Sequence, residues 1–434
     1  MNRRLKANAL GIGAVTFFVV SAAGPLVAMG GGVPVAMLLG NGAGIPAMFG
    51  FAVLILLPFA AGFTAMAQHV RSAGGFYAFA GRGLGRPAAG ITAIIAVFSY
   101  SAIQIGMYGL FGAAAATLAK TLAVTLAAHL PWYVYSALAM AVIGVLGYRQ
   151  VDLSAKVLAL FVICEYLVVL ILDCAVLRNP DVSIAAVSFA PRVFTAGAPW
   201  IALLFCFTAF IGFEATTLYA EEARDPQRTI PIATYLSLIL IGSFYVFSSW
   251  CMVLGVGPDR LTPFLGSLPD PTVFLFQLSD RYVGPWLTLS MRLLFLTSIF
   301  AAMLAFHNAI ARYFYALGRD RLLPMSLGET HPVHGSPHRA SLLQTGAAAA
   351  LLLLFVLAGA DPVTVLFSLV CSVGTLGVIA LMAIASVAVF AFFCSRAGNV
   401  WRVRVFPLMA MISLVLVLVL GCLHFKALTG NATP

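Results

Sequence analysis

Two carboxylates lie in apolar segments where a charge is costly to bury. Glu165 comes nine residues after Lys156 in a run of apolar side chains, which places it about 13 Å along a helix at 1.5 Å per residue. Glu214 follows an apolar run that begins near Trp200. Ionisable side chains are rare in membrane-spanning helices and mark functional sites by default. Both acids are therefore candidates for binding a proton or another cation.

Each of these acids also has a structural interpretation. Glu165 could be tied to Arg292 or to a tyrosine, because buried polar groups are almost always hydrogen-bonded. Glu214 could hydrogen-bond the opened backbone of a broken helix and simply hold the fold. The residue types alone leave both interpretations open.

Further charged residues suggest a gate and an interfacial contact. Glu221 and Glu222 could pair with Arg319 or with other loop arginines and close one side of the molecule, so we assign these three residues a gating role. Arg292 lies a few residues into its apolar run, and its head could reach the interface by snorkelling or bind substrate. Of these two, we favour snorkelling.

Two apolar runs carry signals for an interrupted helix. The first run has Gly24-Pro25 in its middle; proline lacks a backbone donor, and glycine permits unusual dihedral angles. Gly212 stands in a comparable place just before Glu214. Interrupted helices in corresponding positions of two halves point to a substrate site near the middle of the membrane. For either glycine alone, a simple kink is the alternative.

We expect the substrate to lie between these breaks and a third apolar run. In that run Tyr100, Gln104 and Tyr108 recur every four residues and share one helical face. A buried stripe of tyrosines and packed phenylalanines would give the same pattern, and that alternative stays open. The expected substrate-binding residues are Ser21, Ala22, Ala23, Gly24, Tyr100, Gln104, Phe207, Thr208, Phe210, Ile211 and Gly212.

Composition defines the class of protein that must position these residues. The chain is 62% hydrophobic and 9% charged, whereas soluble domains are about 25% charged. Because only helices and closed barrels satisfy their backbone in lipid, and short alternating segments are absent from the sequence, we predict an all-α polytopic membrane protein. About eleven spans are expected, at residues 10–29, 45–66, 88–118, 132–146, 157–176, 199–220, 232–256, 286–317, 341–357, 363–393 and 405–423.

The net charge of +10 follows from this topology. Of the lysines and arginines, 17 fall in loops on the N-terminal side and six on the other side. Cytoplasmic loops carry the excess, so we expect a cytoplasmic N-terminus and, with an odd number of spans, an external C-terminus. Basic residues spread over six loops argue against nucleic-acid binding. The seven cysteines lack metal-ligand spacing, and neither a metal nor another cofactor is expected.

Three segments resemble the amino acid-polyamine-organocation (APC) transporters. One is Phe210-Ile-Gly-Phe-Glu with the following Ala220-Glu-Glu-Ala-Arg-Asp-Pro-Gln-Arg-Thr-Ile-Pro. The others are Ser72-Ala-Gly-Gly-Phe-Tyr-Ala-Phe and the segment from Asn308 to Pro324, in the same order and spacing. The resemblance implies a leucine-transporter-type fold, with inverted repeats at residues 1–177 and 178–395 and an additional helix at 396–434. The substrate is then expected between broken helices 1 and 6.

The chain departs from that family at two functional positions. The first helix carries Ser21-Ala-Ala-Gly-Pro where many relatives have a Gly-Ser-Gly type run. Glu165 occupies a position where several relatives carry a lysine that stands in for a sodium ion. A glutamate reverses that charge, so the lysine mechanism cannot apply unchanged.

We therefore predict a secondary active transporter, not an enzyme, that moves an amino acid or a related amine across the cell (inner or plasma) membrane. Coupling to protons is expected through Glu165 and Glu214, with alternating access between the two broken helices. A polyamine transporter or an amino acid exporter of the same fold is the nearest alternative. A non-transporting sensor or channel differs more, and a membrane-embedded enzyme would need paired aspartates or a His-Glu-x-x-His motif, which the sequence lacks.

Overall fold

The computed structural model describes residues 10–70, 75–122, 129–149, 155–219, 223–332, 335–394, 396 and 398–426. Within these residues the regular secondary structure is helical, apart from one isolated parallel bridge between Leu10 and Ala223. The all-α prediction is confirmed.

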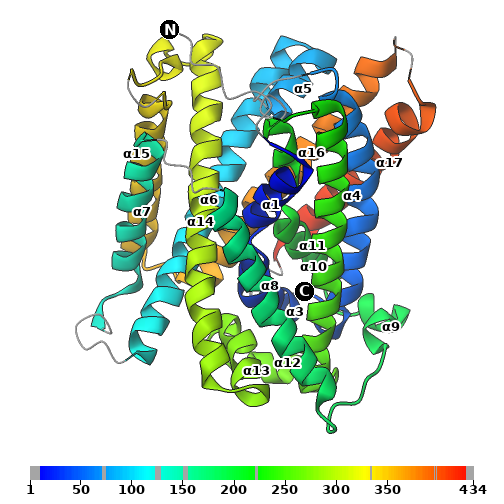
Figure 1. Cartoon of the computed structure of the whole chain (residues 1–434), viewed down its shortest axis with the longest axis vertical. Helices are drawn as coiled ribbons and strands as arrows, with labels where there is room; N and C mark the ends of the chain where they lie inside the picture. Colours follow the sequence, from blue (N-terminus) through cyan, green and yellow to red (C-terminus); the bar gives the residue numbers. More distant parts are fainter. Residues whose placement is uncertain are drawn as a thin grey trace.

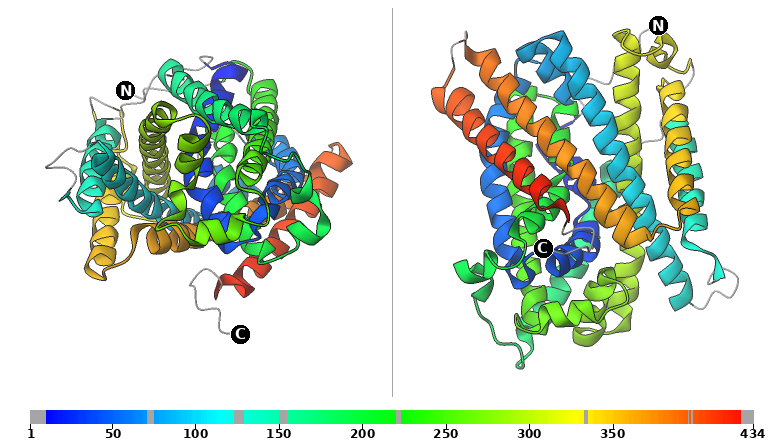
Figure 2. Two further views of the ribbon diagram at one scale, coloured as in Figure 1. Left: turned by 90° about the horizontal axis from the view of Figure 1, so that it is seen from below. Right: turned by 180° about the vertical axis from the view of Figure 1, so that it is seen from behind.

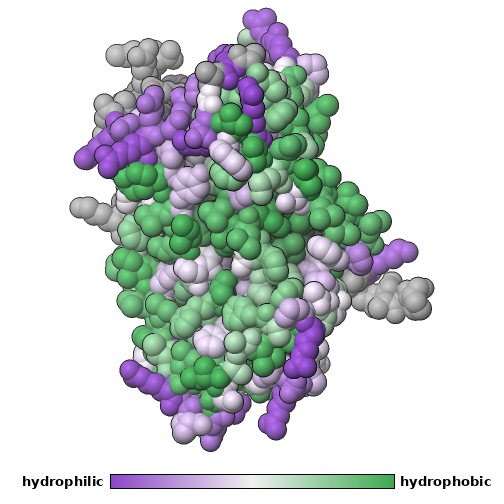
Figure 3. Space-filling model, turned by 90° about the vertical axis from the view of Figure 1, so that its right-hand side faces the viewer, coloured by the Kyte–Doolittle hydropathy of each residue, from purple (hydrophilic) through white to green (hydrophobic). Residues whose placement is uncertain are grey.

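Nine helical segments of the described chain are long and apolar enough to cross a membrane. The shorter apolar helix α10 (Pro199–Phe210) and the 18-residue α7 (Trp132–Arg149) occupy the other two expected crossings. On the face shown in Figure 3, apolar side chains cover the middle, and hydrophilic ones gather at the two ends. The nine segments are Ile12–Leu39, Gly42–Ala67, Arg86–Thr121, Ala159–Arg178, Pro226–Val256, Pro285–Arg319, His338–Leu357, Pro362–Cys394 and Trp401–Leu423.

Long helices surround a broken first segment. In Figure 1 and in the view from below in Figure 2, this dark-blue segment lies among helices from both halves of the chain. Its first helix contacts α8, α11 and α14. The longer helices are α4 (Ile45–Ala67), α6 (Arg86–Thr121), α8 (Ala155–Arg178), α11 (Pro226–Val256), α14 (Pro285–Arg319), α15 (His338–Leu357), α16 (Cys371–Cys394) and α17 (Phe406–Leu423).

Short helices occupy the connections between the spans. They are α5 (Gly75–Leu84), α9 (Pro191–Phe194), α12 (Leu261–Gly266) and α13 (Phe274–Tyr282), with 3₁₀ turns η2 (Gly42–Gly44), η4 (Val187–Phe189), η6 (Pro271–Val273) and η7 (Met325–Gly328). Two π-helical segments, η8 (Pro362–Val370) and η9 (Trp401–Val405), lead into α16 and α17. The predicted repeat boundary at residue 177 falls at the end of α8, while the inverted-repeat relation itself stays a prediction.

The first segment breaks where Gly24-Pro25 predicts it. Helix α1 (Ile12–Ala23) ends at Gly24, whose φ of 56° and ψ of 74° are left-handed. The helical path then resumes as α2 (Pro25–Val27), the π-helical η1 (Ala28–Gly32) and α3 (Val33–Leu39). Glycine adopts this conformation without a Cβ clash, and Pro25 has no N–H to leave unpaired.

The second break lies just before Glu214, also as predicted. Helix α10 ends at Phe210, Ile211 is extended with a ψ of 130°, and Gly212 has a φ of 115°. The chain continues as the 3₁₀ turn η5 (Phe213–Tyr219). Two discontinuous segments therefore meet near the middle of the molecule, since η5 contacts α1.

The helices outside the breaks approach one another closely. A Cβ atom added to Gly106 on α6 would overlap Cys371 Sγ, and one added to Gly374 on α16 would lie 2.6 Å from the Ser99 carbonyl oxygen. Small residues at such contacts let helix backbones pack tightly within a membrane. α6 and α16 are thus tightly packed against each other beside the broken segments.

Candidate substrate and coupling site

Glu165 reaches from α8 to the first break. Its side chain is buried, and Oε2 accepts hydrogen bonds from the Leu26 backbone N–H (3.1 Å) and from Ser298 Oγ (2.9 Å). The Leu26 N–H belongs to the first turn after Gly24, where an N–H has no intrahelical acceptor. Glu165 therefore caps the half-helix that resumes at Pro25.

The second oxygen of Glu165 takes part in neither of these two hydrogen bonds. Oε1 has no hydrogen-bond partner among the residues that the structure describes, and Arg292 is not paired with it. Instead, the Arg292 guanidinium lies 4.7 Å from the centre of the Phe276 ring. The interpretation that ties Glu165 to Arg292 does not match this geometry, whereas a tie to backbone and to Ser298 does.

Glu214 closes the second break. Its Oε2 accepts the Gly212 backbone N–H at 2.8 Å, and its Oε1 accepts the Tyr100 hydroxyl of α6 at 2.9 Å. Tyr245 donates its hydroxyl to the Ala209 carbonyl oxygen at 3.2 Å, which satisfies an acceptor at the end of α10. Glu214 is buried and both of its oxygens are engaged. The geometry matches the interpretation in which Glu214 holds the opened backbone.

Both breaks therefore have a buried carboxylate on a backbone N–H. Hydrogen bonds to an ionised group are roughly twice as strong as neutral ones. The charge of each acid thus affects how firmly its break is held. Glu165 on α8 holds the backbone of a different helix, α2, whereas Glu214 holds the backbone of Gly212 only two residues before it.

The predicted residues of the first break lie at its surface or within it. Ser21 and Ala23 are half-buried and Gly24 is buried. Ser298 Oγ would lie 3.5 Å from a Cβ added to Gly24, so α14 packs directly against the break. Ala22 belongs to α1 as well.

The predicted aromatic and threonine residues of α10 are buried in packing contacts. Phe210 lies against Phe49 and Tyr245, with ring centres 6.2 and 5.7 Å apart. Thr208 shares a hydrogen bond of 2.7 Å with Thr375 of α16. Phe207 and Ile211 are also buried. Their role as substrate contacts stays a prediction.

The residues predicted to share one face of α6 lie in two different environments. Tyr100 reaches the second break through Glu214. Gln104 instead donates to the Met303 carbonyl oxygen at 3.2 Å and accepts from Gln344 at 2.7 Å, which belong to α14 and α15. Tyr100 is therefore brought to the site, while the bonds of Gln104 favour its structural interpretation.

Two buried polar residues were missed from the sequence: Ser298, which contacts Glu165, and Asp173, which lies further along α8. Ser298 carries no sequence signal beyond a small hydroxyl in an apolar run. Asp173 on α8 is buried and accepts a hydrogen bond of 2.6 Å from Ser248 Oγ. It follows Glu165 by eight residues, about two helical turns, so the two acids share a face and the spacing was a usable signal.

At the end of the molecule assigned to the gate, two hydrogen bonds tie segments together that are far apart in the sequence. The Arg224 backbone N–H donates to the Leu10 carbonyl oxygen at 2.9 Å, and Tyr77 of α5 donates its hydroxyl to Asp320. Burial and the hydrogen bond to Asp320 raise the pKa of Tyr77 to about 12. Arg319 lies 6.0 Å from the ring centre of Tyr315. The predicted gate residues Glu221 and Glu222 lie outside the described residues.

The described residues contain no group of three or more His, Cys, Asp or Glu side chains arranged to hold a metal ion. The polar groups observed at the two breaks are carboxylates, hydroxyls and backbone N–H groups.

A bundle of membrane-spanning helices with two broken segments, each capped by a buried acid, has the architecture of a membrane carrier. Comparison with known proteins gives the family: the sequence profile "Amino acid permease" matches residues 10–433. The chain belongs to the amino acid permease family. It is a multi-pass integral membrane transporter and not an enzyme, and its substrate is a small molecule of the amino acid or amine class.

Individual relatives differ in their substrates. Over 357 residues the chain is 28% identical to the branched-chain amino acid permease BcaP of Bacillus subtilis (strain 168), covering 76% of this chain and 70% of that protein. Over 155 residues it is 26% identical to the low-affinity putrescine importer PlaP of Escherichia coli (strain K12), covering 36% and 32%. Over 152 residues it is 32% identical to the vacuolar cationic amino acid transporter 2 of Arabidopsis thaliana, covering 34% and 22%.

Proposed function

We propose that this chain is a proton-coupled carrier of an amino acid or a related amine, working by alternating access between its two broken helices. The observation that carries the proposal is the contact of Glu165 with the Leu26 N–H at the first break. Protonation removes the charge that strengthens this hydrogen bond. Proton binding and the geometry of the break are therefore linked, and a proton shifts the balance of states as far as it binds one state better.

An amino acid fits the charged groups better than a polyamine. A polyamine carries several ammonium groups and no carboxylate, so its site needs several acids with free oxygens. Among the described residues around the breaks, Glu214 has both oxygens engaged and Glu165 has one free. The match to a branched-chain amino acid permease spans most of the chain and supports the same choice. The shorter match to a putrescine importer keeps a polyamine as the second candidate.

We assign the end with the Leu10–Arg224 tie to the cytoplasm and the protein to the cell (inner or plasma) membrane. The excess of lysine and arginine in the loops at that end supports this orientation. The end that carries α12 and α13 then faces outward.

Uptake of radiolabelled L-leucine into proteoliposomes tests proton coupling through Glu165. An imposed pH gradient should drive accumulation by the wild type and not by Glu165→Gln, because the amide retains an oxygen for Leu26 but binds no proton. Glu165→Gln should still catalyse counterflow of labelled for unlabelled leucine. Asp173→Asn is the matched control, since it neutralises another buried acid of α8 and keeps an acceptor for Ser248.

Equal gradient-driven accumulation by wild type and Glu165→Gln would show that Glu165 does not couple the proton. Absence of saturable counterflow by the wild type with any amino acid or amine would exclude a carrier. Competition of leucine uptake by putrescine separates the two substrate candidates.

A further inference from the structure

Three arginines lie at the turn between α16 and α17, at the end of the molecule that carries α5 (Figure 1). They are Arg396, Arg402 and Arg404, of which the first and the last are exposed. Residues 362–434 contain no Asp or Glu. None of the three arginines forms a salt bridge with a residue that the structure describes. The turn is therefore a cationic surface without an acidic partner of its own.

Two of these guanidinium groups meet at the C-terminal end of α16. Arg396 Nη1 donates to the Phe392 carbonyl oxygen at 2.8 Å, and its Cζ lies 3.9 Å from the centre of the Phe392 ring. Arg404 Nη2 donates to the Cys394 carbonyl oxygen at 3.4 Å. The two acceptors are two residues apart, or about 3 Å along the helix axis. Arginines from both sides of the turn thus converge on one helix end.

Most donors of these two arginines are unused. A guanidinium has five N–H donors, and each of the two side chains gives one hydrogen bond to the part of the chain that the structure describes. The unpaired carbonyl groups at a helix C-terminus are equivalent to about half a negative charge. Two guanidinium groups exceed that charge, so a positive site with available donors remains.

Arg402 fixes the turn against α4. Its Nε donates to the Ala61 carbonyl oxygen at 3.4 Å, and its Nη2 donates to Thr64 Oγ1 at 3.2 Å. Asn399 Oδ1 accepts from the backbone N–H groups of Trp401 at 3.1 Å and Arg402 at 3.3 Å, at the start of η9. Contacts with neighbouring elements therefore hold the cationic surface in place.

An apolar surface continues from the cationic one along α17. Trp401 is 63% exposed, and tryptophan is enriched at the level of the lipid headgroups. Met409, Ile412 and Leu416 are exposed and share one helical face, which begins little more than one turn beyond Arg404. A molecule with an anionic head and apolar tails matches this arrangement, whereas an inorganic anion matches only its cationic part.

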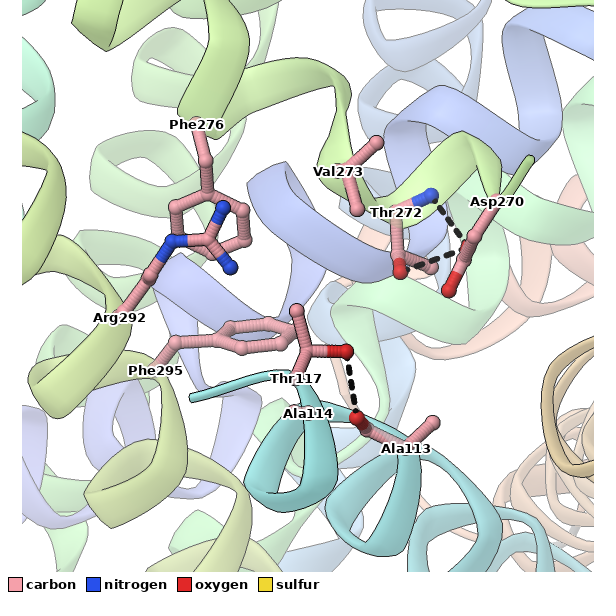
Figure 4. Close-up of a pocket in the computed structure, with 9 residues that line it drawn as sticks. All are labelled: Ala113, Ala114, Thr117, Asp270, Thr272, Val273, Phe276, Arg292 and Phe295. Atoms are coloured by element: carbon pink, nitrogen blue, oxygen red, sulfur yellow. Dashed lines mark hydrogen bonds between the residues drawn. The ribbon is translucent and has the colours of Figure 1, made fainter. Parts of the chain in front are cut away.

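An arginine at the opposite end of the molecule has different surroundings. Arg292 also lies on a phenylalanine ring, that of Phe276, but it lines a small hollow whose wall includes Asp270 (Figure 4). A phosphate in that hollow would be repelled by the Asp270 carboxylate. The turn between α16 and α17 carries no acid, which favours this turn as the place for an anion.

We propose that the α16–α17 turn binds one anionic phospholipid, with its phosphate between Arg396 and Arg404 and its acyl chains along α17. The phosphate accepts charge-assisted hydrogen bonds from both guanidinium groups. Basic groups between membrane-spanning helices on the cytoplasmic side recognise such headgroups. The site contains no residue of the two breaks and does not depend on which substrate the carrier moves.

Native mass spectrometry of the purified full-length protein, titrated in detergent with phosphatidylglycerol, tests the lipid site. The measured quantity is the lipid concentration at which half of the protein carries a first bound lipid. Arg396→Gln/Arg404→Gln should raise it at least tenfold, because both phosphate donors are lost. The matched control is Arg149→Gln/Arg339→Gln, which removes two exposed cations on α7 and α15, away from α17 (Figure 1). The control should bind like the wild type.

Two further measurements identify the ligand class. Phosphatidylcholine, whose headgroup is neutral overall, should bind at least tenfold more weakly than phosphatidylglycerol. Glycerol phosphate, a headgroup without acyl chains, should not displace the bound lipid. Displacement by glycerol phosphate at the concentration that saturates the lipid would indicate a site for a free phosphate and would overturn the lipid assignment.

An equal loss of binding in both double variants would overturn the site, since it would show a general effect of charge at this end. Unchanged binding by Arg396→Gln/Arg404→Gln, or equal binding of phosphatidylcholine by the wild type, would overturn it as well. If the double variant does not fold, Arg404→Gln replaces it, with an expected weakening of at least threefold. None of these outcomes bears on leucine uptake, so the proposed function is tested separately.

Discussion

At the scale of single residues, the site consists of buried acids whose oxygens hold backbone N–H groups. Glu165 and Glu214 each accept one such group, and a hydroxyl supplies a second hydrogen bond to each. Each acid caps a break and lies in a membrane-spanning region, so its ionisation state affects the hydrogen bonds that hold the break. The two interpretations of these acids, coupling and structural support, therefore describe the same contacts.

Tyr100→Phe should destabilise the protein by about 1–3 kcal/mol, because it leaves Glu214 Oε1 buried without its donor. Thermal unfolding in detergent measures the effect. Tyr133→Phe is the control, since Tyr133 is exposed on α7. In a Glu214→Gln background, Tyr100→Phe should change the free energy of unfolding by a different amount, because the effects of mutating two residues in contact are not additive. Equal unfolding temperatures for Tyr100→Phe and Tyr133→Phe would rule out this contribution.

The acids and the breaks were predictable from the sequence because their signals are local. Gly24-Pro25 and Gly212 are breaks by their own backbone chemistry, and Glu165 and Glu214 are conspicuous among apolar neighbours. Their hydrogen-bond partners were not predictable. Ser298 lies 133 residues from Glu165, and Tyr100 lies 114 residues from Glu214. Such pairs depend on how the helices pack.

At the scale of elements, each break depends on a glycine at a position where other residues are strained. Gly24 has a positive φ, and a Cβ there would lie 3.2 Å from Val27 Cγ2. Gly32 lies in the same broken segment with a helical φ of −70°, and a Cβ there meets nothing within 4 Å. Gly24 thus has the left-handed conformation that the break requires, whereas Gly32 has an ordinary helical one.

Gly24→Ala should lower stability by about 1–2 kcal/mol, the cost of a left-handed conformation for a residue with a Cβ. It should also slow leucine uptake, since the α1–α2 angle must change to relieve the strain. Gly32→Ala should be neutral or slightly stabilising, because alanine favours a helix over glycine. Unfolding temperature and initial uptake rate measure both variants. If both variants behave alike, the break does not depend on the conformation of Gly24.

At the scale of the whole molecule, contacts at the two ends involve different chemistry. One end has a small hollow with Arg292 and Asp270 in its lining, and the other has the Leu10–Arg224 and Tyr77–Asp320 hydrogen bonds. The Tyr77 tie joins α5 to the end of α14. Because its donor is a phenol with a raised pKa, its contribution depends on pH in the alkaline range.

The stabilising effect of Tyr77 should be complete below pH 10 and should disappear as the pH rises through about 12. The folded protein keeps the phenol proton in this window, whereas the unfolded chain, with a pKa near 10.0, loses it. The difference in unfolding temperature between wild type and Tyr77→Phe should therefore shrink between pH 9 and pH 12. A difference that stays constant over this range contradicts the prediction.

α14 runs without interruption from Pro285 to Arg319, and its C-terminal cap is Asp320. At 1.5 Å per residue it is about 52 Å long. Arg292 and Phe295 near its N-terminal end, Ser298 at the capped break and Asp320 at its C-terminal cap are all carried by this one continuous helix. A rotation of α14 about its own axis changes the direction of all four side chains at once. Any movement of α14 in the proposed carrier cycle would therefore alter the contacts at both ends of the molecule together.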